Sequence, residues 1–149
     1  MNVEIVRRGA GRKYPLRGIK KTTIGILRLL KQERAEVSLA LVGNREIRKL
    51  NALFRKQDYP TDVLSFPAAE NLPGRLRLLG DVVISVDKAR AQAQEHGRTL
   101  REEVISLLIH GIVHLLGYDH ERSARDARVM KRLESKIFRA LCDGDRLQV

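Results

Sequence analysis

Three histidines in one short stretch are the residues best suited to do chemistry: HGIVHLLGYDH, residues 110–120. On a helix, His110 and His114 would lie on one face, one turn apart, close enough to share a cation. Gly117 can take a positive φ, so the chain can turn back and let His120 supply a third nitrogen. Three imidazoles suit Zn²⁺ and leave a position for water. We therefore predict one Zn²⁺ per chain, used for hydrolysis.

A lone histidine is usually an ordinary core or surface residue. Here three of the chain's four histidines fall within residues 110–120, and a chance cluster of that form is improbable. His96 stands outside the cluster, beside Gly97, where a histidine can cap a helix end. We expect no metal-binding role for His96.

The spacing of the three histidines is also that of metzincin proteases, in which a glutamate directly after the first histidine is the general base. Gly111 occupies that place in this chain. Glycine cannot accept a proton, so the pattern keeps the metal site but argues against a peptidase.

Two helices must position the histidines. Thr99 and Glu102 fit a capping box, which predicts a helix that runs to Leu116 and stops at Gly117. A last amphipathic helix is expected from about Ser123 to Leu141. Its apolar stripe would hold Val129, Leu133, Ile137 and Leu141.

The rest of the chain alternates between short strands and helices. Asn44 is expected to cap a helix that carries Ile47, Leu50 and Leu53 on one face. Further helices are predicted over 15–34 and 87–96, strands over 2–6, 36–42, 61–66 and 78–85, and an exposed loop over 67–77. This pattern predicts one α/β or α+β domain, residues 1–149, around a sheet of about four strands.

Composition limits the partners. The chain has 149 residues and a net charge of +11, from 29 Lys and Arg against 18 Asp and Glu. Such charge attracts phosphate-bearing partners such as nucleic acid, although it also simply keeps small proteins in solution. Cys142 is the only cysteine, and no apolar run approaches the ~20 residues that cross a bilayer. With no signal segment visible at the start, we expect a cytoplasmic protein without membrane contact.

Four blocks, in order, resemble the YbeY-type endoribonuclease family, also called ribosomal RNA maturation factors. They are LNALFRKQDYPTDVLSFP at 50–67, LGDVVIS at 79–85, the histidine stretch with its glycine, and a closing helix with Met130 and Glu134. The resemblance covers roughly residues 39–141.

This resemblance implies a single-domain α/β metalloprotein with a mixed sheet and about five helices, similar in architecture to metzincin proteases. It implies a metal-dependent single-strand endoribonuclease in ribosomal RNA processing, notably at the 3′ end of the small-subunit RNA, and in ribosome quality control. Its partner would be ribosomal RNA or the small ribosomal subunit. The metal ligands carry over to His110, His114 and His120, and the family's functional arginine to Arg55.

Each further residue has an ordinary interpretation beside the functional one. Arg55 is one basic side chain among many, but near a metal it could clamp a phosphate with two hydrogen bonds. We expect Asp62 to shape a turn and Tyr118 to pack. Ser65 could bond near the site or only occupy a strand, and Asp119 could orient a ligand histidine or only shape its turn.

Two other functions stay open from the sequence. One is a metallohydrolase of a peptide or small molecule, since metal geometry alone does not choose the substrate. The other is a non-enzymatic ribosome assembly factor in which the metal is structural. Structural zinc usually has four protein ligands, often Cys, so three histidines favour an open site.

Overall fold

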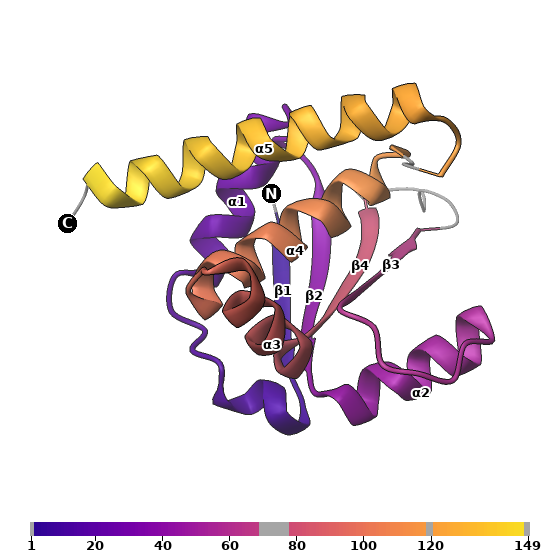
Figure 1. The fold of residues 1–149 in the computed structure, drawn as a ribbon. Coiled ribbons are helices and arrows are strands. Elements are labelled where there is room, and N and C mark those ends of the chain that lie inside the picture. The colour runs from indigo at the N-terminus through magenta and orange to yellow at the C-terminus, as the bar shows by residue number, and fades with distance from the viewer. Residues whose placement is uncertain (1, 69–77, 119–120, 148–149) are drawn as a thin grey trace.

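The protein is built on one four-stranded sheet in the strand order β1-β2-β4-β3. The computed structural model describes residues 2–68, 78–118 and 121–147, with the backbone alone over 143–147. The three parallel strands are β1 (Asn2–Arg7), β2 (Glu36–Val42) and β4 (Leu78–Ser85), and β3 (Val63–Pro67) pairs antiparallel with β4 at the edge (Figure 1). The mixed sheet agrees with the predicted fold class.

Five α-helices and one 3₁₀ helix complete the described part of the chain. They are η1 (Gly9–Lys13), α1 (Ile19–Leu29), α2 (Asn44–Arg55), α3 (Val86–His96), α4 (Leu100–Leu115) and α5 (Ala124–Leu147). The long α5 crosses one end of the molecule and α2 lies near the β3 edge (Figure 1). No helix in the described ranges is long and apolar enough to cross a membrane.

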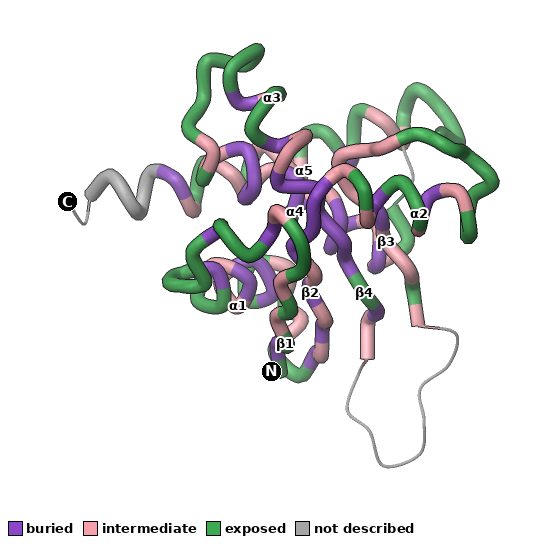
Figure 2. The backbone as a smooth tube through the Cα atoms, turned by 90° about the horizontal axis from the view of Figure 1, so that it is seen from below, coloured by how far each residue is buried: buried purple, intermediate pink, exposed green. Residues whose placement is uncertain are grey.

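Alternation along the strands divides the core in two. Leu39 and Leu41 of β2 point to the larger cluster, which α1, α4 and α5 complete, because successive side chains of a strand face opposite ways. Val42 points to the smaller cluster, with Ile47 of α2 and Leu64 of β3. Buried residues gather along α4 and the strands, while the outer side of α2 is exposed (Figure 2). The sheet thus lies between α4 and α2.

Helix α4 is the central helix of the larger core, and its N-terminus is the predicted capping box. The Thr99 Oγ accepts from the Glu102 N–H at 3.1 Å, and Glu102 Oε1 accepts from the Thr99 N–H at 3.0 Å. The helix ends at Leu115, one residue before the predicted end, and Gly117 has a φ of 96°. A left-handed residue there turns the chain out of the helix, as the sequence predicted.

Helix α1 is shorter than predicted. Gly18 has a φ of 86° and Lys31 a φ of 57°, both outside the helical region, so the helix is confined between them. The edge strand β3 begins two residues after its predicted start. Residues 69–77 of the expected loop lie outside the described part of the chain.

Two predictions about α2 were wrong. Gly43 occupies the cap position, with its N–H donated to Glu46 Oε2 at 3.2 Å, and Asn44 is already helical. Leu53 is 73% exposed and does not share the buried face of Ile47. At 3.6 residues per turn, each three-residue step falls about 60° short of a full turn, so Leu53 has rotated off that face.

The predicted stripe on α5 is right for three of its four members. Ile137 is buried, and Leu133 and Leu141 pack against the core, but Val129 is 45% exposed. Each four-residue step overshoots a full turn by about 40°, which moves Val129 about 80° from Ile137. Met130 takes its place on the buried face.

Candidate metal and active site

His110 and His114 lie together on one face of α4, as their spacing predicts. Their ring centroids are 4.8 Å apart, with an interplanar angle of 73°. Both are half-buried, and both line a cavity of about 380 Å³. His120, the third predicted ligand, and Asp119 lie outside the described residues. Glu121, which follows His120 in the sequence, lines the same cavity.

A carboxylate from α5 orients the first histidine. The His110 Nδ1 and Glu134 Oε1 are 2.7 Å apart. The hydrogen bond to Glu134 raises the pKa of His110; burial opposes the shift, and the charges of Glu134 and Asp62 add to it. In the neutral ring the carboxylate favours a proton on Nδ1, which leaves Nε2 unprotonated. That is the form in which an imidazole can ligate a metal.

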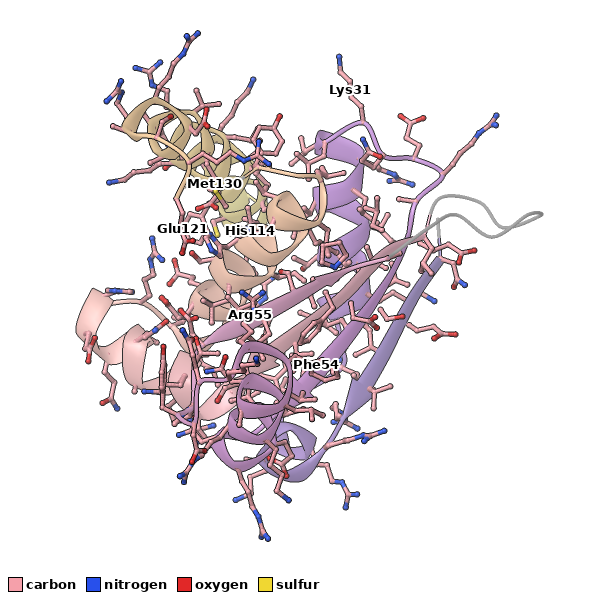
Figure 3. All side chains as sticks on the ribbon, turned by 90° about the vertical axis from the view of Figure 1, so that its right-hand side faces the viewer. Lys31, Phe54, Arg55, His114, Glu121 and Met130 are labelled. Carbon is pink, nitrogen blue, oxygen red and sulfur yellow. The ribbon has the colours of Figure 1, made fainter. Side chains whose placement is uncertain are left out.

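Three further elements supply the other cavity walls. They are the end of α2 with the segment after it, the strand β3, and the chain just before α5. Besides the two histidines and Glu121, these walls contain Asn51, Arg55, Gln57, Thr61, Val63, Leu64 and Ser65. Arg55, His114 and Glu121 lie on the same side of the molecule (Figure 3). The cavity therefore brings an arginine to the histidine pair.

Arg55 is the last residue of α2 and is held against the edge strand. Its Nη2 donates to the Ser65 carbonyl at 3.2 Å, while the side chain stays exposed. Asn51, one turn earlier, is buried and donates from Nδ2 to the Tyr59 carbonyl at 2.9 Å. This bond ties the segment after α2 back to the helix. Arg55 is thus placed at the cavity, whereas its part in catalysis stays a prediction.

The packing around Gly111 disfavours a protease-type glutamate at this position. A Cβ on Gly111 would lie 2.6 Å from Val82 Cγ1 and 3.3 Å from Ser65 Oγ. Helix α4 therefore approaches β4 and β3 so closely that a side chain at this position would have to displace Val82. The Ser65 Oγ also donates to the Gly111 carbonyl at 2.9 Å, so this strand serine helps hold the histidine helix.

The other residues considered in the sequence analysis have structural roles or lie exposed outside the cavity. The Asp62 carboxylate accepts from the Val63 N–H at 2.7 Å and from Gln92 Nε2 at 3.2 Å, which agrees with the expected turn-shaping role. Tyr118 was predicted to pack, but it is 39% exposed. His96 lies 3.1 Å from the buried Glu103 carboxylate and is not among the residues that line the cavity.

Comparison with known proteins agrees with the motifs. The family model described as Endoribonuclease YbeY matches residues 12–142. This chain belongs to the YbeY endoribonuclease family. An Endoribonuclease YbeY from Sulfurihydrogenibium sp. is 48% identical over 138 residues, 93% of this chain and 88% of the relative. One from Persephonella marina is 47% identical over 139 residues, with the same two shares.

The fold of this YbeY-family chain also has a solved counterpart. The solution structure of TM1509 from Thermotoga maritima aligns with a TM-score of 0.68 and 29% identity, covering 98% of this chain and 93% of the other. The resemblance inferred from the four sequence blocks is therefore confirmed. The likeness to metzincin architecture stays a prediction.

Sequence reasoning missed the partner of the first YbeY histidine. Glu134 was noted only as part of a motif, because 24 residues separate it from His110 and no local spacing links them. Across residues 2–68, 78–118 and 121–142, where side chains are described, no group of three or more His, Cys, Asp or Glu side chains is arranged to hold a metal ion. Two predicted ligands are described, and the third lies outside those ranges.

Proposed function

We propose that this protein is a Zn²⁺-dependent endoribonuclease that cleaves single-stranded ribosomal RNA. The observation that carries the proposal is the cavity that His110, His114 and Arg55 line together. Two imidazoles and an exposed guanidinium suit a phosphodiester, because they combine metal-binding nitrogens with a donor for phosphate oxygens. Membership of the YbeY family supports the same reaction class.

The donor set fits Zn²⁺. His110 and His114 would hold the ion from α4, with His120 as the third ligand. The hydrogen bond between His110 Nδ1 and Glu134 supports this role, since ligand histidines usually give their second nitrogen to a carboxylate or carbonyl. When bound, the ion would polarise the phosphoryl oxygen and activate water for attack.

Arg55 would position the RNA phosphate. One guanidinium N–H donates to the Ser65 carbonyl, which holds the group at the cavity wall. A guanidinium has five N–H donors in a planar fork, so the others can reach two oxygens of one phosphate. This contact would stabilise the charge that builds on the phosphoryl group during cleavage.

The substrate class follows from charge and from packing. A net charge of +11 favours a polyanion over a peptide. The close contact of Gly111 with Val82 disfavours a protease-type base at that position. We further propose that the protein acts in the cytoplasm on the small ribosomal subunit, in maturation of the RNA 3′ end.

Elemental analysis of protein purified without added metal, paired with cleavage assays, tests the proposal. Wild type should contain one zinc per chain and cut a single-stranded fragment of small-subunit RNA, but neither an RNA duplex nor a peptide. His114→Ala should lose most of the metal and the cleavage. His96→Ala is the matched control, since His96 is not among the cavity-lining residues, and it should keep both.

Three other outcomes of these assays would contradict the proposed function. Full metal occupancy in His114→Ala would remove the proposed site. Peptide cleavage without RNA cleavage would assign the protein to another hydrolase class. Metal binding without cleavage of any substrate would favour the assembly factor, with the ion as a structural group.

A further inference from the structure

The end of α2 exposes an unusual amount of apolar surface. Leu53, Phe54 and Tyr59 are 73%, 61% and 53% exposed, more than any other large hydrophobic residue in the described part of the chain. They fall within seven residues of each other and are flanked by the exposed Arg48 and Lys49. We call these five residues the α2 surface. Single exposed apolar side chains are common on monomeric proteins, whereas a contiguous group of them marks an interaction site.

Both aromatic rings of the α2 surface are held by neighbours. The Phe54 ring packs edge-on against Phe66 of β3, with centroids 5.2 Å apart and an interplanar angle of 62°. The Tyr59 hydroxyl donates to Gln57 Oε1 at 2.9 Å. The Tyr59 backbone is fixed by the hydrogen bond from Asn51. The rings therefore stay on the surface and lose little freedom when a planar ligand stacks on them.

The charge around these rings is strongly positive. Residues 44–59 carry five basic side chains and two acidic ones, and of these acids Glu46 accepts the Gly43 N–H at the helix start. An open hollow of about 780 Å³ on this side is lined in part by Arg45, Arg48, Lys49 and Leu53. Asp58 also lines it and forms an ion pair with Arg48, accepting from Nε at 2.8 Å and from Nη2 at 3.3 Å, so part of the positive charge is already neutralised. Excess positive charge beside exposed rings is the composition that binds single-stranded nucleic acid.

The α2 surface continues into the candidate active site. Arg55, the residue after Phe54, lines the histidine cavity, and so does Gln57, the hydrogen-bond partner of Tyr59. Figure 3 shows Arg55 between Phe54 and His114. A strand with one phosphate in the cavity can therefore extend along α2 without leaving the protein.

We propose that the α2 surface binds the single-stranded RNA that flanks the cleaved bond. Bases stack on Phe54 and Tyr59, and a phosphate contacts Lys49. This inference rests on the proposed function for the position of the cleaved bond. It would account for the proposed single-strand preference, because bases stacked inside a duplex cannot lie on protein rings.

Fluorescence anisotropy of the full chain with labelled oligouridylate tests the stacking. Phe54→Leu keeps an apolar side chain but removes the ring, and should weaken binding about five- to tenfold, the lower range for one lost base–aromatic stack. Phe54→Tyr should bind within about twofold of wild type, since the ring remains. Leu29→Ala, at an exposed leucine on α1, is the control and should bind as wild type.

A second pair of variants, one on the α2 surface and one far from it, tests the phosphate contact. Lys49→Gln should lower the slope of log affinity against log salt by about 0.7, as expected for one lost phosphate contact to a single strand. Lys31→Gln should leave the slope unchanged, because Lys31 lies at the far end of the molecule from Phe54 (Figure 3). Melting temperatures of all variants confirm that they are folded.

Three outcomes would overturn the inference: Phe54→Leu binds as wild type; Phe54→Tyr loses as much affinity as Phe54→Leu; or the variants lose a protein partner while oligouridylate binding is unchanged. Cleavage by wild type, measured separately, distinguishes this failure from that of the proposed function. If wild type cleaves RNA and the variants bind normally, the α2 surface alone is wrong. If wild type cleaves no RNA, the proposed function fails whatever the binding shows.

Discussion

Replacing Gly111 with alanine should destabilise the protein, although alanine is the better helix former. The new Cβ would lie 2.6 Å from Val82 Cγ1 and 3.2 Å from Cγ2. Val82 is fully buried in β4, and its branched side chain has few alternative rotamers. Because the clashing neighbour is buried and rigid, the cost falls in the upper half of the usual overpacking range, about 2–3 kcal/mol, and alanine returns about 1 kcal/mol of helix propensity. The net loss is then about 1–2 kcal/mol, or roughly 2–8 °C in melting temperature.

Reversible urea denaturation of four proteins measures this directly: wild type, Gly111→Ala, Val82→Ala and the double variant. Because Val82→Ala removes both clashing methyl groups, the double variant should be more stable than the sum of the single losses by about 1 kcal/mol. A Gly111→Ala protein as stable as wild type, or strictly additive losses, would refute the steric account. The absence of the protease glutamate would then need another cause.

The other predictions concern the site. Glu134→Gln should weaken zinc binding about 10- to 100-fold with the fold intact, since carboxylate partners of ligand histidines typically matter that much; unchanged affinity in a chelator competition would contradict the role of Glu134. Arg55→Ala should lower single-turnover cleavage about 10²- to 10³-fold at unchanged metal content, and Arg55→Lys should recover little; wild-type rates would remove Arg55 from the mechanism. The raised pKa of His110 should make metal-free protein lose stability as pH rises through that pKa, because the protonated ring is favoured when folded. Denaturation of metal-free Glu134→Gln at several pH values should show a smaller loss, and an equal loss would contradict the cause assigned to the shift.

Local periodicity was enough to predict several parts of the molecule. The capping box at Thr99 and the approach of His110 to His114 depend only on residues within one or two turns of a single helix. Strand β2 was predicted with the bounds it has in the structure for the same reason. Predictions failed where the helix face was extrapolated over several steps, as at Leu53 and Val129, because small angular errors accumulate.

By itself, then, the sequence determined that two histidines share one face of a helix, that strands and helices alternate, and that the chain resembles the YbeY family. Only the tertiary structure decided which residues, distant in the sequence, contact the histidine helix. Glu134 reaches His110 across 24 residues, and Ser65 reaches Gly111 across 46. Such contacts depend on strand order and on how closely α4 packs against the sheet and α5, and no local pattern encodes either. Arg55 likewise comes to the histidine cavity because α2 leads to the edge strand β3, which packs beside α4.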